Sequence, residues 1–99
     1  MPADLVPPIA AALAAVERAT RHLQDSPPDD RAAGAVPYLH LFAGTLGGFL
    51  LARGAATADS ADWPALARFY VTSLLPSALA LEGPAMAGVA SLDAPLPAG

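Results

Sequence analysis

The chain has 99 residues, of which 55% are hydrophobic and only 14% are charged, and its formal net charge is −4. It contains five Arg, no Lys and no Cys, which argues against a phosphate-tracking basic stripe and excludes disulfides and cysteine-ligated metals. Soluble domains usually carry about 25% charged residues. The deficit predicts apolar surface that the chain leaves uncovered, as at a docking face or a membrane contact. No positive region precedes the first apolar run, so we expect a cytoplasmic protein without a secretory signal.

The first predicted element is a helix over residues 5–24. Two prolines near its start are tolerated because N–H groups in a first turn have no helical partner. Side chains at steps of three and four residues form one predicted buried face. They are Leu5, Ile9, Leu13, Val16, Thr20 and Leu23. Residues 25–30 form a proline-containing linker, and Asp29 or Asp30 is predicted to cap the next helix.

The second predicted helix contains the segment around which the chain is organised, residues 35–53, and reaches Thr57. No Asp, Glu, Lys or Arg lies between Arg31 and Arg53, and apolar residues cover nearly the whole circumference, which predicts a buried central helix. Pro37 removes a backbone hydrogen bond and is predicted to kink the helix. Glycines at 44, 47 and 48 each cost about 1 kcal/mol of helix propensity relative to Ala. We therefore expect another backbone to approach closely on the glycine side.

The third predicted helix begins at the N-cap Asp62 and is bent by Pro76. Residues 82–84, Glu-Gly-Pro, predict its end, with Gly83 as the C-terminal cap. The chain is thus predicted to be all-α: a three-helix bundle over residues 1–84, with Pro-kinked second and third helices, and a mostly irregular tail over residues 85–99. The predicted core consists of Val36, Tyr38, Phe42, Phe49, Phe69, Tyr70 and Leu74.

Chemistry-bearing residues are sparse and scattered. His40 is the only titratable side chain between Arg31 and Arg53 besides Tyr38. No orienting carboxylate lies at helical spacing, so we interpret His40 as a hydrogen-bonded core or boundary residue. His22 suits the C-terminal end of the first helix. Two isolated histidines do not make a metal site. The residues therefore predict no catalytic, cofactor-binding or metal-binding site and no autonomous enzyme activity.

One alternative concerns membranes. The uncharged stretch of residues 32–52 is long enough to span a bilayer, and Gly44 and Gly48 form a small-xxx-small motif typical of dimerising transmembrane helices. Pro37, His40 and the amphipathic neighbouring helices favour a soluble bundle instead. A small membrane-associated protein that dimerises through Gly44 and Gly48 remains the second hypothesis.

Three strings, taken in order, resemble those of one family. They are Val36-Pro-Tyr-Leu-His-Leu-Phe42, Gly47-Gly-Phe-Leu-Leu-Ala-Arg53, and Ala67-Arg-Phe-Tyr70 followed by Leu74-Leu-Pro76. With them, and with the in-helix prolines at 37 and 76, residues 3–90 are similar to the extra C-terminal helical domain that follows the core of some acyl-CoA dehydrogenases. The chain departs from that pattern in a short segment between the second and third helices and in the break at residues 82–84.

The resemblance implies a non-catalytic structural or interaction module, a piece or subunit of an FAD-dependent enzyme of fatty-acid degradation. The flavin-binding domain and catalytic glutamate of that family lie upstream of the module, so FAD belongs to the implied parent or partner enzyme. The implied partners are dehydrogenase core domains or a second copy, not nucleic acid. The family-motif and core positions are Pro37, Tyr38, Leu39, Phe42, Gly47, Gly48, Phe69, Tyr70, Leu75 and Pro76. Arg53 and Arg68, near helix ends, are predicted interdomain contacts.

Overall fold

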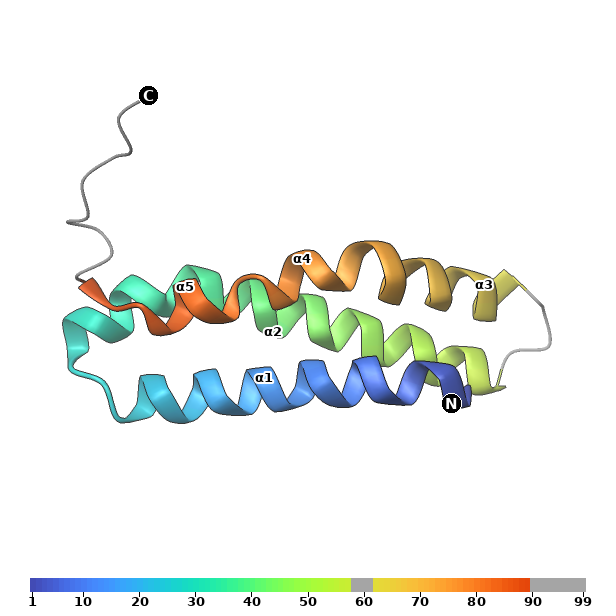
Figure 1. Cartoon of the computed structure of the whole chain (residues 1–99), viewed down its shortest axis with the longest axis horizontal. Coiled ribbons are helices and arrows are strands. Elements are labelled where there is room, and N and C mark those ends of the chain that lie inside the picture. The colour runs from blue at the N-terminus through green and yellow to red at the C-terminus, as the bar shows by residue number, and fades with distance from the viewer. Residues whose placement is uncertain (58–61, 90–99) are drawn as a thin grey trace, which may run out of the picture.

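The computed structural model describes residues 1–57 and 62–89 (Figure 1). In these ranges the chain is all-α and has no strand, as predicted. Three helical rods lie side by side. They are α1 (Val6–Gln24), α2 (Pro28–Thr57) and a third rod over residues 62–86, and α2 contacts both others. The third rod is a succession of short helices rather than one helix. The elements are η1 (Ala3–Leu5), α1 (Val6–Gln24), α2 (Pro28–Thr57), α3 (Asp62–Phe69), η2 (Tyr70–Leu74), α4 (Leu75–Leu79) and α5 (Glu82–Met86).

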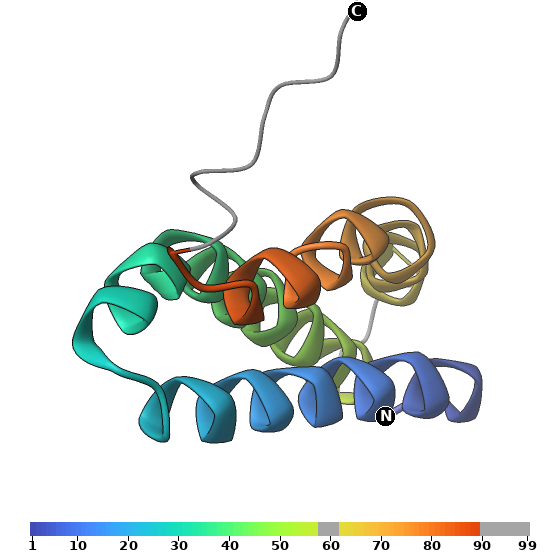
Figure 2. The same ribbon diagram turned by 60° about the vertical axis from the view of Figure 1, so that its left-hand side comes forward.

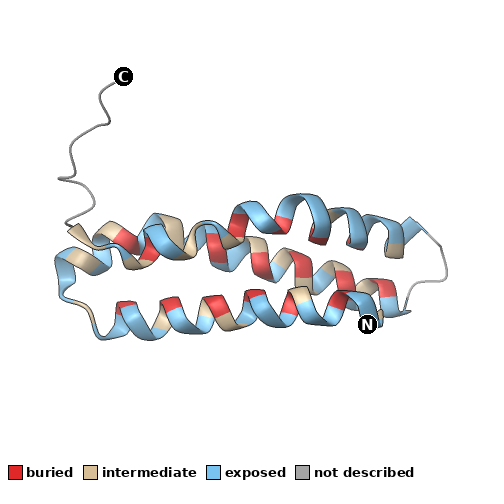
Figure 3. Ribbon diagram, in the orientation of Figure 1, coloured by how far each residue is buried: buried red, intermediate tan, exposed pale blue. Residues whose placement is uncertain are grey.

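Small residues dominate the interior. Three alanines of α1, at 12, 15 and 19, are almost completely buried, whereas Leu13, predicted on the same face, is about half exposed. The prediction for Leu13 is wrong because α1 packs through its alanines, and the larger side chains flank the contact. Buried residues line the facing sides of the rods in Figure 3, and the outer sides are mostly exposed. The buried apolar residues are Leu5, Ile9, Ala12, Ala15, Ala19, Leu23, Leu41, Ala52, Ala55, Ala67, Val71, Leu75, Ala78 and Ala85.

The predicted aromatic core is only partly present. Tyr38, Phe49 and Tyr70 pack against the buried residues. Val36 and Phe69 are 65% and 58% exposed, and Phe42 and Leu74 are also exposed, so their assignment to the core is wrong. An interior filled by alanines brings the helices close together and leaves no room for these larger side chains.

Pro37 lies inside the continuous helix α2, and Figure 2 shows the turquoise start of α2 running at a different angle from its green continuation. The glycines predicted to admit another backbone face other elements of the same chain. A Cβ built on Gly44 would lie 2.5 Å from the Cβ of Ala78, and one built on Gly48 would lie 3.1 Å from the Tyr70 ring. The Tyr70 hydroxyl donates a hydrogen bond of 2.6 Å to the Gly44 carbonyl.

The third rod accommodates Pro76 through a wider helical turn that directly precedes this residue. Residues of η2 form a π-helical turn, and the N–H of Leu75 donates to the carbonyl of Tyr70, five residues back. Proline lacks an N–H, and its ring collides with the carbonyl four residues earlier in a regular α-helix. A wider turn relieves that collision, so the disturbance that the sequence predicts at Pro76 takes the form of a π-turn.

The bundle continues beyond residue 84, so the predicted boundary is wrong. Gly83 lies inside α5, and Pro84 occupies its first turn, where proline is tolerated. Ala85, assigned to the irregular tail, is fully buried. The left-handed cap occurs instead at Gly88, with a φ of 75°. The N–H of Val89 donates to Asp30 Oδ1 at 2.8 Å, which ties this end to the start of α2.

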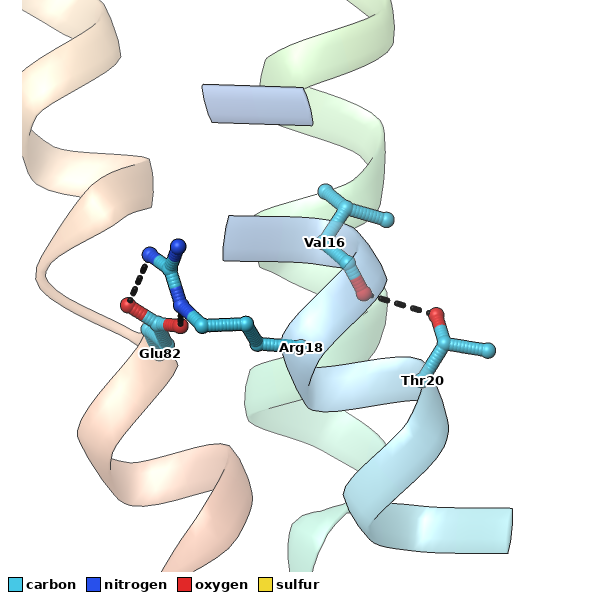
Figure 4. A network of polar contacts seen from close by, with 4 residues as sticks. All are labelled: Val16, Arg18, Thr20 and Glu82. Atoms are coloured by element: carbon cyan, nitrogen blue, oxygen red, sulfur yellow. Dashed lines mark hydrogen bonds and ion pairs between the residues drawn. The ribbon is translucent and has the colours of Figure 1, made fainter. Parts of the chain in front are cut away.

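Three arginines tie the rods together. Arg18 of α1 makes a bidentate pair with Glu82 of α5, with Nε 2.7 Å from Oε2 (Figure 4). Arg68 of α3 pairs in the same way with Asp4 of η1. Arg31 donates from Nε to the Leu23 carbonyl at 3.1 Å and from Nη2 to the Ser26 carbonyl, capping the C-terminal end of α1.

The pair between Arg18 and Glu82 makes stability depend on pH. The hydrogen bonds from Arg18 hold the pKa of Glu82 below its ordinary value of 4.5. A depressed carboxylate pKa adds stability above the unfolded-state pKa, and this contribution is lost as pH falls through the folded-state pKa. We expect Glu82→Gln to be less stable than wild type at pH 7 and the difference to shrink below pH 4.5, as measured by urea unfolding. A difference independent of pH would contradict this assignment.

Candidate docking face

A groove runs between α1 and α2 on one side of the bundle. Its wider part, a cavity of about 500 Å³, is lined by Thr20, Leu23, Gln24, Arg31, Ala35, Tyr38 and Leu39. Its narrower part, of about 260 Å³, is lined by Leu13, Val16, Phe42, Thr45, Leu46 and Phe49. We call these residues together the docking groove. The two parts adjoin at Tyr38 and Phe42, whose ring centroids are 6.2 Å apart.

The wider part of the groove has a polar side. Thr20 donates its hydroxyl hydrogen to the Val16 carbonyl at 2.7 Å, as Figure 4 shows. A threonine hydroxyl has one hydrogen, so the Tyr38 hydroxyl is the donor in its 2.6 Å bond to Thr20 Oγ1. This chain of bonds fixes the Tyr38 ring across the groove wall.

The narrower part is apolar, and its rim is formed by half-exposed side chains. Leu13, Phe42 and Leu46 are each between 44% and 47% exposed. When a partner's apolar side chain enters a hollow with apolar walls, its removal from water contributes strongly to the binding free energy. The geometry of the groove therefore suits an apolar partner surface better than a polar substrate.

Thr45 lies beneath this part of the groove, and its Oγ1 is buried without a hydrogen-bond partner among the described residues. An unsatisfied buried hydroxyl costs about 1–3 kcal/mol. We expect the near-isosteric Thr45→Val to raise the free energy of unfolding by about 1 kcal/mol in urea unfolding. A destabilisation of that size would instead show that the hydroxyl has a partner in solution.

The predicted family-motif positions separate into covered and uncovered sets. Leu75 is buried, Tyr70 is half buried, and its ring covers Gly47 and Gly48. Leu39, at 62% exposure, lies at the edge of the docking groove, so its core assignment is wrong within this chain. Its exposure follows from α2 being covered by neighbouring rods on only part of its circumference.

The two predicted interdomain arginines differ. Arg68 already pairs with Asp4 of the same chain. Arg53 is exposed and has no hydrogen bond or ion pair within residues 1–57 and 62–89. Of the two, Arg53 is therefore the side chain whose charge is available to another molecule.

The described residues do not form a metal-binding cluster. No three His, Cys, Asp or Glu side chains in this part of the chain lie close enough to hold a metal ion. His40 is exposed and forms no hydrogen bond within it, so its interpretation as a hydrogen-bonded core or boundary residue is wrong. His22 lies in the last turn of α1, as predicted.

Two described segments, α2 and residues 62–86, are long and apolar enough to cross a membrane by length and composition, a test that core helices of soluble proteins also pass. The predicted dimer motif is already occupied, because Ala78 and Tyr70 of this chain cover Gly44 and Gly48. In the folded chain these glycines therefore face the chain's own residues 70 and 78.

The family model for the acetyl-CoA dehydrogenase C-terminal-like domain matches residues 2–94. The chain belongs to this family. The match covers nearly the whole sequence and includes the three strings that carry the resemblance. No curated protein and no solved structure matches the chain.

Proposed function

We propose that this chain is a non-catalytic helical module that docks, through the docking groove, onto the core domains of an FAD-dependent acyl-CoA dehydrogenase. The proposal is supported chiefly by the positions of small and large side chains, because small residues are buried and large hydrophobic residues are exposed. Alanines fill much of the interior, while twelve large hydrophobic residues of the described part of the chain are exposed. Burying such side chains against a partner contributes about 25 cal/mol for each Å² removed from water.

In this proposal the catalytic work belongs to the core. FAD, the acyl-CoA substrate and the catalytic residues are held by the core domains, in the cytoplasm, and the module contributes apolar contact area. Leu13 and Phe42 of the groove are the anchoring side chains. Fatty-acid degradation is the process in which such an enzyme acts.

The proposal is tested by binding. The purified chain is titrated into a flavin-containing acyl-CoA dehydrogenase core from the same genome, and co-sedimentation is followed through flavin absorbance. We expect saturable binding that Phe42→Glu and Leu13→Glu each weaken at least tenfold, because a charge is buried in the apolar contact. Leu66→Glu, at an equally exposed position on α3, is the matched control.

Two results would overturn the proposal. The first is the absence of binding to dehydrogenase cores at high micromolar concentration, and the second is binding that Phe42→Glu leaves unchanged. Helix content measured by circular dichroism should stay constant in all three variants because the altered side chains are exposed. If the chain can be purified only in detergent, the membrane-associated alternative is favoured instead.

A further inference from the structure

The outer side of α2 carries a regular seam. Its members are separated alternately by three and four residues and are all exposed. They are Asp29, Ala32, Val36, Leu39, Ala43, Leu46, Leu50 and Arg53. Alternating spacings of three and four define the contact positions of a coiled coil. We call these residues the α2 seam.

The seam is apolar between its charged ends. Val36 and Leu50 are 65% and 53% exposed, and neither lines the docking groove. The outer side of a helix in a monomeric three-helix bundle is normally polar. The seam follows α2 through its bend at Pro37 and is about 36 Å long at 1.5 Å per residue along the helix. A second α2, bent in the same way, has the same length.

We infer that the seam pairs with the α2 seam of a second copy of this chain, in an antiparallel two-fold arrangement. In an antiparallel coiled coil, each seam position faces the other type of seam position on the second helix. This pairing places Leu39 against Ala43 of the second copy and Leu50 against its Ala32. A large side chain then meets a small one, and Leu46 meets Val36.

The charges at the ends select the orientation. Antiparallel pairing places Arg53 beside Asp29 of the second copy, twice by symmetry. Both side chains are exposed, and neither has a hydrogen bond or ion pair among the residues that the structure describes. Parallel pairing would place Asp29 against Asp29 and Arg53 against Arg53. Opposite helix dipoles also favour the antiparallel arrangement.

This self-association does not depend on the docking proposal. The seam and the docking groove share Leu39 and Leu46. The groove anchors Leu13 and Phe42 lie outside the seam, however, and seam positions 36 and 50 lie outside the groove. The experiment therefore uses the isolated chain, and its result does not depend on whether a dehydrogenase core binds.

Sedimentation equilibrium of the purified chain is the first test. We expect a reversible dimer with twice the monomer mass of 9.9 kDa. Leu50→Glu should make the chain monomeric across the concentration range, and Leu66→Glu on α3 should leave the dimer intact. Circular dichroism verifies that both variants remain helical. A wild-type chain that stays monomeric at several hundred micromolar overturns the inference, as does a dimer that Leu50→Glu does not weaken.

Charge reversal tests the register. Arg53→Asp and Asp29→Arg should each weaken the dimer about tenfold at low salt, because two attractive pairs become repulsive. The double variant restores opposite charges and should recover the wild-type dissociation constant to within about threefold. If the double variant is as weak as the single ones, the antiparallel register is wrong.

Cross-linking tests the orientation separately, since the chain has no native cysteine. Ala32→Cys combined with Leu50→Cys should form a disulfide-linked dimer under mild oxidation, because the two positions face each other across the two-fold axis. Either single variant should cross-link poorly. Efficient cross-linking of Ala32→Cys alone would indicate parallel pairing and contradict the inference.

Discussion

Leu41→Ala is expected to lower the free energy of unfolding by about 3 kcal/mol, within the range of about 2–5 kcal/mol for buried leucines. Leu41 is fully buried and is one of the largest completely enclosed side chains among the described residues. It packs in the cluster that contains Ala15, Ala19 and Ala85. Alanine neighbours have no side-chain freedom with which to fill the space, so the cavity should persist. A domain of this size is stable by only about 5–15 kcal/mol.

Urea unfolding followed by circular dichroism measures this loss as a fall in the transition midpoint at constant slope. Leu66→Ala is the control, because Leu66 is about half exposed and belongs to neither the docking groove nor the α2 seam. We expect it to cost less than 1 kcal/mol. Equal losses in the two variants would show that the cluster around Leu41 is not the packed interior of the folded chain.

Gly34→Ala is expected to destabilise the chain by about 2 kcal/mol, although alanine is the better helix former. A Cβ at position 34 would lie 2.2 Å from the carbonyl oxygen of Ala85 and 2.9 Å from Cδ2 of Leu23. The first contact is with backbone, so α5 must move away from α2. Overpacking of this kind costs up to about 3 kcal/mol, and helix propensity returns about 1 kcal/mol.

Gly83→Ala provides the matched control for this prediction. Gly83 also lies within a helix, but nothing lies within 4 Å of the position that its Cβ would take. We expect this variant to be more stable than wild type by up to about 1 kcal/mol. If both glycine variants were stabilised, α5 could not approach α2 as closely as the structure shows.

The contrast between these glycines indicates where sequence reasoning succeeds. The glycines inside α2 correctly predict the close approach of another element. Each glycine is unfavourable within a helix, and a close contact that a larger residue would prevent compensates for this cost. The closest backbone contact is nevertheless at Gly34 rather than at Gly44 or Gly48. Contact partners depend on which helices lie side by side, and one sequence does not supply that information.

The prolines at 37, 76 and 84 lead to the same conclusion. Pro37 and Pro76 disturb their helices as predicted because the missing N–H and the ring clash are local properties. Pro84 followed a glycine and was predicted to end a helix, whereas it lies in the first turn of α5. The same residue suits both positions, and only the packing of Ala85 against α1 and α2 decides between them.

The candidate site was less predictable than the fold. The low charge content predicts an uncovered apolar surface, and the structure contains one. Phe42 was assigned to the interior because large apolar residues usually lie there, and its exposure on the groove is revealed only by the structure. Arg53 was predicted as an interdomain contact from its place near a helix end, and this remains a prediction.

The sequence by itself determined the all-α class, the local effects of Pro37 and Pro76, the lack of cysteine chemistry and the family resemblance, which depend on composition and short-range spacing. Tertiary structure alone decided which side of each helix is covered. Buried alanines on the facing sides of the helices, together with Gly34, let the three rods approach closely. The contacts between helices are therefore made by small residues. Large side chains such as Leu39, Phe42 and Leu50 are therefore left on the outside, where another protein surface can cover them.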